Sequence, residues 1–339
     1  MKHNILMGIS VLPALLIMPA FSDTITTRQV ITDDTTYNDL TATNIASSTA
    51  NNGGVFYMEN TPTTTLTFNG TSTFSGNSLN NGGMGGVIGN GWLSSTSGTG
   101  YTPGGKIIFN GDASFSSNTT NNPNGGGAIF NYGNGTTANP DIRFNGDTNF
   151  SGNSTTGTSN NSVFSGGGAI NHNNGTIIFD DSANFSSNTS IYRGGAILSG
   201  GDIVFDDNAT FDRNTATTSG GAIAILGGNV SFADSAVFTG NTAAAGAAIF
   251  LDNTNSQLTF ADTATFSSNT GTGILLNNNS TGTVSFANGV TFDRNTNPLN
   301  GSLVNVGTIT GTGGDFIFTN NTGSNGGGLK NSGTVSIDT

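Results

Sequence analysis

Four aspartates are the side chains of this sequence whose type and spacing could do chemistry. Asp181, Asp207, Asp234 and Asp262 recur at intervals of 26, 27 and 28 residues. If the fold stacks successive repeats at the spacing of neighbouring β-strands, about 5 Å, these carboxylates form a column. Such a column could bind Ca²⁺ through its oxygen atoms, or supply the acid and the base of a glycan-cleaving site.

The same position also suits a structural role. Asp is a common turn residue because its carboxylate accepts hydrogen bonds from the nearby backbone. Asn288 and Gly111, which are turn residues as well, occupy this position in other repeats. We therefore predict that the four aspartates are turn residues and that the chain has no catalytic residue, metal or cofactor. Calcium binding and acid/base catalysis are the alternatives.

Two aromatic residues are the candidates for ligand binding. Trp92, the only tryptophan, and Tyr101 lie in an insertion at residues 91–105. Exposed aromatic side chains in a loop often mark a binding site. The alternative is that they pack over the side of the fold.

We predict that the remaining charged and titratable residues of interest lie at the surface. His172 stands in the polar run Asn171-His172-Asn173-Asn174, and the only other histidine is His3, so we expect it at the surface. Arg213 and Arg294 lie in matching Phe-Asp-Arg-Asn segments. We expect each arginine to pair with the aspartate before it at a solvated corner; contact with an acidic partner is the alternative.

Composition excludes several classes of protein. The absence of cysteine rules out a disulfide framework, thiol catalysis and a Cys-type zinc site. The formal charge is −12, with 8 basic against 20 acidic residues, which argues against binding nucleic acid or anionic lipid through a basic patch. The 23 phenylalanines argue against disorder, because disordered chains are poor in aromatic residues.

A repeat must position these residues. The motif Phe-x-x-Asn occurs nine times, and its spacing settles at 26 residues in the C-terminal half. In eight copies another Phe stands six residues earlier, with an aliphatic residue two positions before that Phe. Apolar and polar residues alternate here, which predicts a strand with one buried face, and Arg143 occupies an outward position. The nine copies begin at Phe74, Phe115, Phe150, Phe185, Phe211, Phe238, Phe266, Phe292 and Phe318.

A third strand follows a pair of glycines. Gly-Gly-Ala-Ile begins at Gly126, Gly167, Gly194 and Gly220, with looser copies elsewhere. Either the Ala or the Ile position could face inward; Lys330, which we align with the Ile position, favours the Ala position. The glycine pair would form a corner where φ is positive.

Three short strands that recur every 26 residues, without the two-residue turns of hairpins, predict a chain that winds forward. We predict an all-β fold, a right-handed parallel β-helix with three short strands per coil of about 26 residues. Stacked Phe and Asn side chains would form structural ladders along it. Their members are Phe115, Phe150, Phe185, Phe211, Phe238, Phe266, Phe292, Asn118, Asn153, Asn188, Asn214, Asn241, Asn269 and Asn295.

The chain divides into three parts. Residues 1–22 combine Lys2, an apolar run and small residues before Asp23, which is typical of a signal peptide. Residues 23–52 lack the Phe pattern and are expected to cap the first coil. Residues 53–339 form the repeat domain of about ten coils, the last of them incomplete, with insertions at 91–105, 132–140 and 154–165.

Gly-Gly-Ala-Ile paired with Phe-x-x-Asn over nine repeats after a signal peptide resembles the polymorphic membrane proteins of chlamydiae. The resemblance covers residues 53–331. It implies an autotransporter passenger that is displayed at the bacterial outer membrane surface or released from it, with a role in adhesion. This chain departs from the family in having no cysteine and no C-terminal translocator barrel, and we expect the intact gene to continue into more coils and a barrel.

These observations together predict an exported adhesin-like protein that binds a host-cell or extracellular protein or glycan and no nucleic acid. Its contact with a membrane would come only through a translocator that this chain does not include. A polysaccharide lyase or hydrolase is one alternative, although it requires acids beside Lys or Arg on one outer face. A passive structural surface protein is the other. The open C-terminal coil also predicts self-association.

Overall fold

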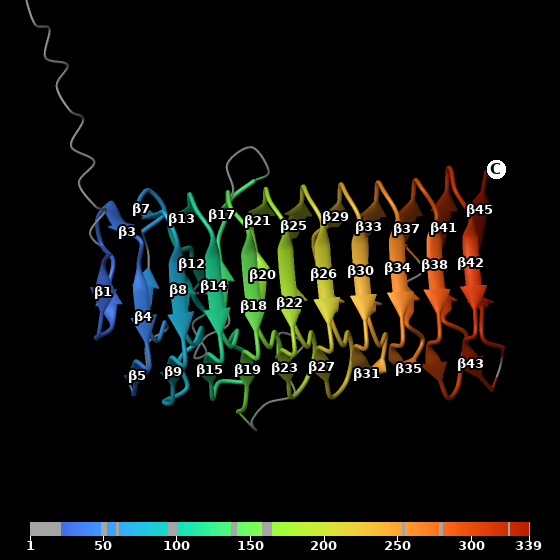
Figure 1. Cartoon of the computed structure of the whole chain (residues 1–339), viewed down its shortest axis with the longest axis horizontal. Helices are drawn as coiled ribbons and strands as arrows, with labels where there is room; N and C mark the ends of the chain where they lie inside the picture. Colours follow the sequence, from blue (N-terminus) through green and yellow to red (C-terminus); the bar gives the residue numbers. More distant parts are fainter. Residues whose placement is uncertain are drawn as a thin grey trace, which may run out of the picture.

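The computed structural model describes residues 22–48, 53–58, 61–93, 101–136, 141–157, 165–252, 255–277, 281–324 and 326–338. The regular structure of these residues is β-strand throughout, and they contain no helix that could cross a membrane. Figure 1 shows the strands side by side along one long axis, in the order of the sequence. The predicted parallel β-helix is confirmed.

Two of the four long sheets carry the paired Phe strands. Sheet A has eleven strands: β1 (Thr24–Ile25), β4 (Thr41–Thr43), β8 (Ser72–Ser75), β14 (Ala113–Ser116), β18 (Thr148–Ser151), β22 (Ala183–Ser186), β26 (Ala209–Asp212), β30 (Ala236–Thr239), β34 (Ala264–Ser267), β38 (Val290–Asp293) and β42 (Phe316–Thr319). Sheet C also has eleven: β3 (Thr35–Asn38), β7 (Thr65–Asn69), β13 (Lys106–Phe109), β17 (Ile142–Phe144), β21 (Thr176–Phe179), β25 (Asp202–Phe205), β29 (Val230–Phe232), β33 (Gln257–Phe260), β37 (Thr283–Phe286), β41 (Thr308–Gly311) and β45 (Thr334–Ile337).

The other two sheets complete each coil. Sheet B holds the eleven strands that follow the glycine pairs: β2 (Gln29–Val30), β6 (Phe56–Met58), β10 (Ile88–Asn90), β16 (Ile129–Tyr132), β20 (Ile170–Asn174), β24 (Ile197–Ser199), β28 (Ile223–Ile225), β32 (Ile249–Leu251), β36 (Leu275–Asn277), β40 (Leu303–Asn305) and β44 (Leu329–Asn331). Sheet D holds ten short strands: β5 (Ala46–Ser47), β9 (Ser78–Leu79), β15 (Thr119–Thr120), β19 (Ser154–Thr155), β23 (Thr189–Ser190), β27 (Thr215–Ala216), β31 (Thr242–Ala245), β35 (Thr270–Thr272), β39 (Thr296–Asn297) and β43 (Thr322–Gly323).

One coil passes through the four sheets in the order C, A, D, B. In a central coil the chain runs from β21 to β22, β23 and β24 before β25 begins the next coil. Each of these strands pairs in parallel with its equivalent one coil later. The three predicted strands are therefore present, and a strand of two to four residues after each Phe-x-x-Asn motif adds a fourth sheet. The right-handed sense of winding stays a prediction from the general crossover rule.

The first coil comes from the segment for which we predicted a cap. Residues 24–47 supply β1 to β5, which place a terminal strand in each of the four sheets. Tyr37 takes the position of the first Phe column and stacks on Phe68, with ring centroids 6.0 Å apart. The Phe pattern was missed there because Tyr37 and Ala42 replace the two phenylalanines of later coils.

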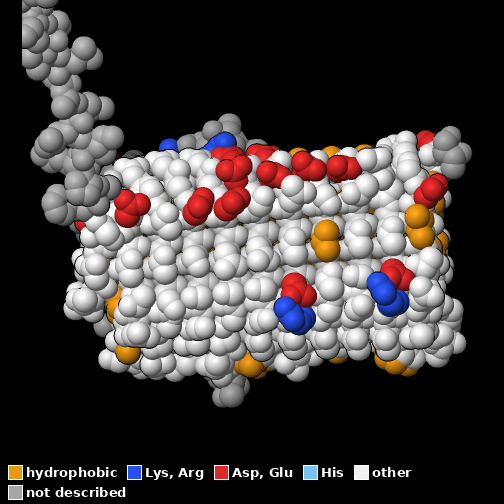
Figure 2. Space-filling model, in the orientation of Figure 1, with side chains coloured by type: hydrophobic (Ala, Val, Ile, Leu, Met, Phe, Trp, Pro, Cys, Tyr) orange, Lys and Arg blue, Asp and Glu red, His pale blue; other side chains and the backbone are white. Residues whose placement is uncertain are grey.

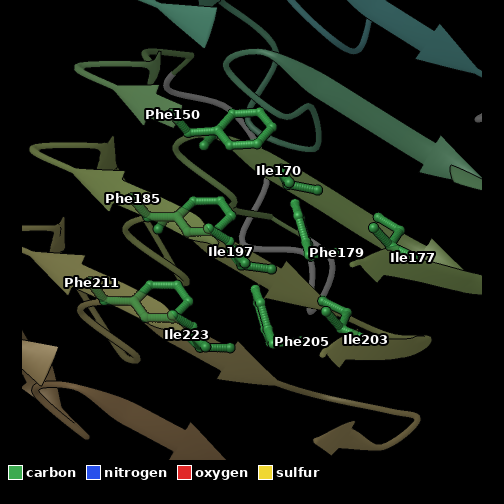
Figure 3. Close-up of a cluster of buried hydrophobic side chains, with 14 of the residues drawn as sticks. Phe150, Ile170, Ile177, Phe179, Phe185, Ile197, Ile203, Phe205, Phe211 and Ile223 are labelled. Atoms are coloured by element: carbon green, nitrogen blue, oxygen red, sulfur yellow. The ribbon is translucent and has the colours of Figure 1, made fainter. Parts of the chain in front are cut away.

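Two stacks of phenylalanine fill the interior. Phe185 and Phe211 stack with ring centroids 4.9 Å apart and an interplanar angle of 4°. Phe179 and Phe205 form the second stack, and the two stacks meet edge to face (Figure 3). Aromatic pairs prefer both geometries, so each coil adds two favourable ring contacts to the burial of its side chains.

One coil lacks its first Phe, and the neighbouring strand compensates. Gly311 occupies the position that Phe286 fills one coil earlier. Phe316 stands where the coils from β8 to β38 have Ala, Val, Ser or Thr, and its ring reaches Phe286, with centroids 5.3 Å apart. A side chain on Gly311 would collide with the ring of Phe316, so the small and the large residue depend on each other.

The glycine pair performs two different tasks. Gly194 has a φ of 61°, as predicted for a corner. A Cβ on Gly195 would lie 2.0 Å from the carbonyl oxygen of Gly221 in the next coil, so that position has no room for a side chain. The following Ile197 points inward towards the phenylalanines (Figure 3), which decides the inward face that the sequence left open. Lys330 pairs with Val304, one position beyond the Ile column, so our alignment of Lys330 with that column was wrong.

Asparagine ladders close the corner between sheets A and D. The Oδ1 of Asn214 accepts hydrogen bonds from both the backbone N–H and the side-chain Nδ2 of Asn188, each at 3.0 Å. Its own Nδ2 donates to Asn241 Oδ1 at 3.0 Å and to the carbonyl oxygen of Phe185 at 2.9 Å. All hydrogen-bonding groups of this buried amide are used, and the predicted ladder is present.

The C-terminal edge of the described coils carries exposed apolar side chains. Leu329 and Ile337 lie in the last strands of sheets B and C and are 44% and 40% exposed. Ile337 occupies the column of Phe286. Self-association through this edge stays a prediction.

The register predicts how single substitutions change stability. Phe211→Ala should lower the free energy of unfolding by about 3–5 kcal/mol, because this ring is fully buried and its loss leaves a cavity. Thr259→Ala, on the outer face of sheet C, should cost under about 0.5 kcal/mol. Urea unfolding of the two variants beside the parent chain measures both values, and equal losses would contradict the register.

Candidate functional site

The outer face of sheet A is a regular polar surface. Its strands alternate buried and outward residues, and the outward ones are mainly Ser, Thr and Asn. Figure 2 shows the result as a mainly uncharged band, with a row of acidic side chains along one side and two pairs of acidic and basic side chains towards the other. In β8 to β38 the outward residues are Thr73, Ser75, Ser114, Ser116, Asn149, Ser151, Asn184, Ser186, Thr210, Asp212, Val237, Thr239, Thr265, Ser267, Thr291 and Asp293.

Two grooves lie on this face at equivalent positions of the repeat. The first has a volume of about 410 Å³ and crosses β14, β18 and β22. The second has a volume of about 360 Å³ and crosses β34, β38 and β42. Both run between the corner that joins sheet C to sheet A and the first outward column of sheet A. The strands β26 and β30 separate them.

The first groove combines carboxylate, amide and hydroxyl groups over a floor of small residues. Asp112 and Asp147 line its corner side, and both are exposed. Asn149 and Asn184 line the other side, and Asn184 Nδ2 donates to Asn149 Oδ1 at 3.4 Å. The floor includes Ala113, which is buried. The groove therefore presents both donors and acceptors to a ligand.

The four aspartates singled out in the sequence lie at the same corner, beyond the grooves. Asp234 Oδ1 accepts the backbone N–H of Ser235 at 2.9 Å, and Asp262 Oδ1 accepts that of Thr263 at 2.7 Å. Asp207 makes the equivalent bond to Asn208. Asp181 is exposed at the same corner. These contacts are those of turn residues.

The carboxylate of Asp262 also bonds to the next coil. Asn288 Nδ2 donates to Asp262 Oδ1 at 2.7 Å. This bond, with the backbone N–H of Thr263, lowers the pKa of Asp262 below its ordinary value. Among the residues that the structure describes, no group of three or more His, Cys, Asp or Glu side chains is arranged to hold a metal ion.

The two arginines of the matching segments lie at the opposite border of sheet A. Arg213 bonds Asp212 at 2.6 Å and Arg294 bonds Asp293 at 2.8 Å, so the predicted local pairing is confirmed. Both arginines have a φ of 52°, which non-glycine residues rarely adopt. The residue before the ladder Asn thus takes the unusual backbone angle.

The predicted aromatic candidates lie elsewhere. Trp92 and Tyr101 belong to an antiparallel hairpin, β11 (Trp92–Leu93) and β12 (Tyr101–Thr102), in the turn between sheets B and C. Their side chains lie outside the described part of the structure. The hairpin belongs to a different side of the coil from sheet A, so the structure does not bring these residues together with the aspartates or the grooves.

His172 was predicted at the surface, and that prediction was wrong. The side chain is fully buried in β20, where it follows Asn90 and Asn131 in a column. Its Nδ1 lies 3.0 Å from Asn131 Nδ2, which can only donate, and its Nε2 lies 3.1 Å from the carbonyl oxygen of Asp202. These partners assign the proton to Nε2. Burial lowers the pKa of His172 to about 4.

His172 belongs to a second ladder that the sequence analysis missed. Asn90 Nδ2 donates to Asn131 Oδ1 at 2.8 Å, and Asn277 Nδ2 donates to Asn305 Oδ1 at 2.9 Å near the other end. The available signal was an Asn two residues after the inward aliphatic residue of sheet B. The Oδ1 atoms of Asn90 and Asn277 have no hydrogen-bond partner, because Met58 and Leu251 stand one coil earlier.

Asp141 is a second buried titratable group that sequence reasoning did not single out. Its Oδ1 accepts the backbone N–H groups of Asn134 and Gly135 at 3.0 and 2.7 Å, and its Oδ2 accepts that of Thr176 at 2.7 Å. Burial nonetheless raises the pKa of Asp141 above its ordinary value. Since its bonds hold a turn together, we assign it a structural role.

The buried histidine predicts a pH dependence of stability. The unfolded chain protonates His172 near its ordinary pKa of 6.5, whereas the folded chain does so only near 4. Stability is therefore full above pH 6.5 and falls between pH 6.5 and 4, by about 3 kcal/mol at one unit of pKa per 1.36 kcal/mol. His172→Asn, which extends the asparagine ladder, should flatten this fall. Urea unfolding of both chains at pH 7 and pH 4.5 tests this prediction. If the free energy of unfolding falls by the same amount between these pH values in both chains, the assignment is refuted.

The turn role of the aspartates predicts indifference to calcium. Adding EDTA to the purified chain should leave the melting temperature unchanged, because the carboxylates bond neighbouring backbone groups. A clear fall that added Ca²⁺ reverses would favour the calcium alternative. Asp207→Asn in the same assay is the control, since Asn keeps the turn bond and removes the charge.

Comparison with known proteins gives no indication of the function, so the interpretation rests on the geometry of the chain. No family model, no curated protein and no solved structure matches this sequence.

Proposed function

We propose that this chain is the exported, surface-displayed passenger of an autotransporter-type protein, and that it acts as an adhesin-like binding protein through the outer face of sheet A. Residues 1–22 would direct its export. The ligand would be an extended host-cell or extracellular molecule that contacts several coils at once.

The observation that carries this proposal is the pair of equivalent grooves on one regular polar face. Their volumes, about 410 and 360 Å³, are in the range of small-ligand sites. Repetition of the same groups along the axis suits multivalent contact, in which weak contacts add to useful avidity. The Phe stacks and Asn ladders beneath hold the face rigid, which lowers the entropy that binding would cost.

The arrangement argues against a lyase. A polysaccharide lyase would need a free Lys or Arg as its base beside carboxylates on the same face. Arg213 and Arg294, the basic residues at the border of sheet A, are each paired with the adjacent aspartate. The passive structural alternative makes the grooves incidental, and a binding experiment separates it from the other two.

Binding should depend on sheet A and not on sheet C. We expect beads coated with residues 23–339 to adhere to cultured host cells, or to spots on an array of glycans and matrix proteins. Thr210→Arg combined with Thr265→Arg should reduce the number of adhering beads at least several-fold, because the long, charged arginine side chains would obstruct the polar face. Thr67→Arg combined with Thr259→Arg, the matched change on sheet C, should leave it intact.

Three outcomes would contradict the proposal. Beads that bind no cell and no array spot would favour the passive structural protein. Equal losses in the two variants, both of which melt like the parent chain, would place binding elsewhere. Release of reducing sugar ends from an array glycan would favour an enzyme.

A further inference from the structure

We infer that the face of sheet A binds a neutral linear polysaccharide, which lies along the axis of the helix in the two grooves. This inference rests on the proposed function and names its class of ligand. The geometry, the chemistry and the charge of the grooves each point to it.

The geometry favours a linear polymer that crosses the strands. Successive coils repeat every groove position at the spacing of the stacked rings, 4.6 Å between Phe115 and Phe150 and 4.9 Å between Phe150 and Phe185. A ligand along the axis meets the same set of groups at each coil. A polysaccharide presents its own hydroxyl groups with the same regularity, residue after residue, so one mode of contact can repeat along the groove.

The chemistry of the groove matches sugar hydroxyls. Each hydroxyl both donates and accepts, and the groove offers the acceptors Asp112 and Asp147 on one side and the amides of Asn149 and Asn184 on the other. Hydrogen bonds to carboxylates are roughly twice as strong as those between neutral groups. The Asp112 and Asp147 carboxylates are exposed at the corner, so a ligand can reach them.

The second groove repeats this design with Asp315 on the corner side and Thr265 and Thr291 on the other. A chain long enough to pass β26 and β30 would engage both grooves. The link between the two contacts raises the effective concentration of the second, so affinity should rise with chain length.

Charge and composition exclude the competing ligands. The acidic border repels anionic glycans. Protein interfaces depend on buried aromatic residues and arginines. Among the described strands β8 to β42 the outward positions hold no aromatic residue, and the large apolar ones are Val237 and Ile317. A protein partner would therefore find no aromatic anchor at these outward positions.

Native gel electrophoresis of residues 23–339 through soluble polysaccharides tests the inference. We expect at least one neutral polymer among dextran, galactomannan, arabinoxylan and mixed-linkage β-glucan to retard the chain. Alginate and polygalacturonate should not. Longer fragments of the retarding polymer should compete better than short ones at equal sugar concentration. Retardation by the anionic polymers alone, or by none, would overturn the inference.

A matched pair of variants locates the contact. One variant removes the outward groups of both grooves. Its polymer concentration for half-maximal retardation should rise about tenfold or more, since a lost hydrogen bond costs about 1 kcal/mol. It carries Asn149→Ala, Asn184→Ala, Thr265→Ala and Thr291→Ala together. The control carries four changes on the outer face of sheet C, Thr67→Ala, Ser231→Ala, Thr259→Ala and Ser336→Ala, and should be retarded like the parent. Equal retardation of the two variants, both folded by their melting curves, would overturn the inference.

The two proposals fail separately. If no polysaccharide retards the chain while the arginine variant on sheet A still abolishes adhesion, the face binds another ligand and only this inference fails. If a neutral polymer retards the chain while the beads adhere to no cell, the adhesin proposal fails and the polysaccharide site stands.

Discussion

The hydrogen bonds of the buried asparagine ladder are the constraint on which the rest of the structure depends. Each amide from Asn118 to Asn295 joins three coils, because it bonds the asparagines before and after it and the carbonyl oxygen of a Phe in the preceding coil, as Asn214 does. A buried polar group that lost these partners would cost about 1–3 kcal/mol. Only one register satisfies all of them, so the ladder fixes how each coil lies on the last and draws the preceding residue, even Arg213, into a left-handed conformation.

A fixed register makes the outer faces periodic. Once Phe185 and Phe211 stack, the residues between the buried ones must also align, and Asn184 lies beside Thr210 with no freedom to slip. Sheet A then presents one lattice of polar groups over its whole length. The grooves are a consequence of this alignment, since each is bounded by residues of three consecutive strands that would not line up in another register.

The sequence predicted the parts of the fold that rest on alternation. Paired Phe residues and the outward Arg143 defined both faces of sheets A and C, and the structure confirms them. Sheet D was not predicted, because two residues are too few for a period to show. His172 was misplaced for a related reason: an Asn-rich run is typical of a loop, and only the partners Asn131 and Asp202 explain a buried imidazole. The grooves arise because the surface between the C-to-A corner and the first outward column of sheet A is hollowed, and a residue pattern does not predict such a depth.

The distribution of the insertions separates the sides of the helix. The long insertions at 91–105, 132–140 and 154–165 enter the turns that lead into sheets B and C. The turn from sheet C to sheet A instead has three residues in each coil from β13 to β38, and four between β41 and β42. Turns tolerate added residues at small thermodynamic cost, so this constancy is not required for stability. A ligand that spans the coils from β13 to β38 meets a corner of the same length in each of them, and the longer corner before β42 lies at the end of the second groove. The side of the molecule on which the turn length is constant over these coils is therefore the side that the proposed binding uses.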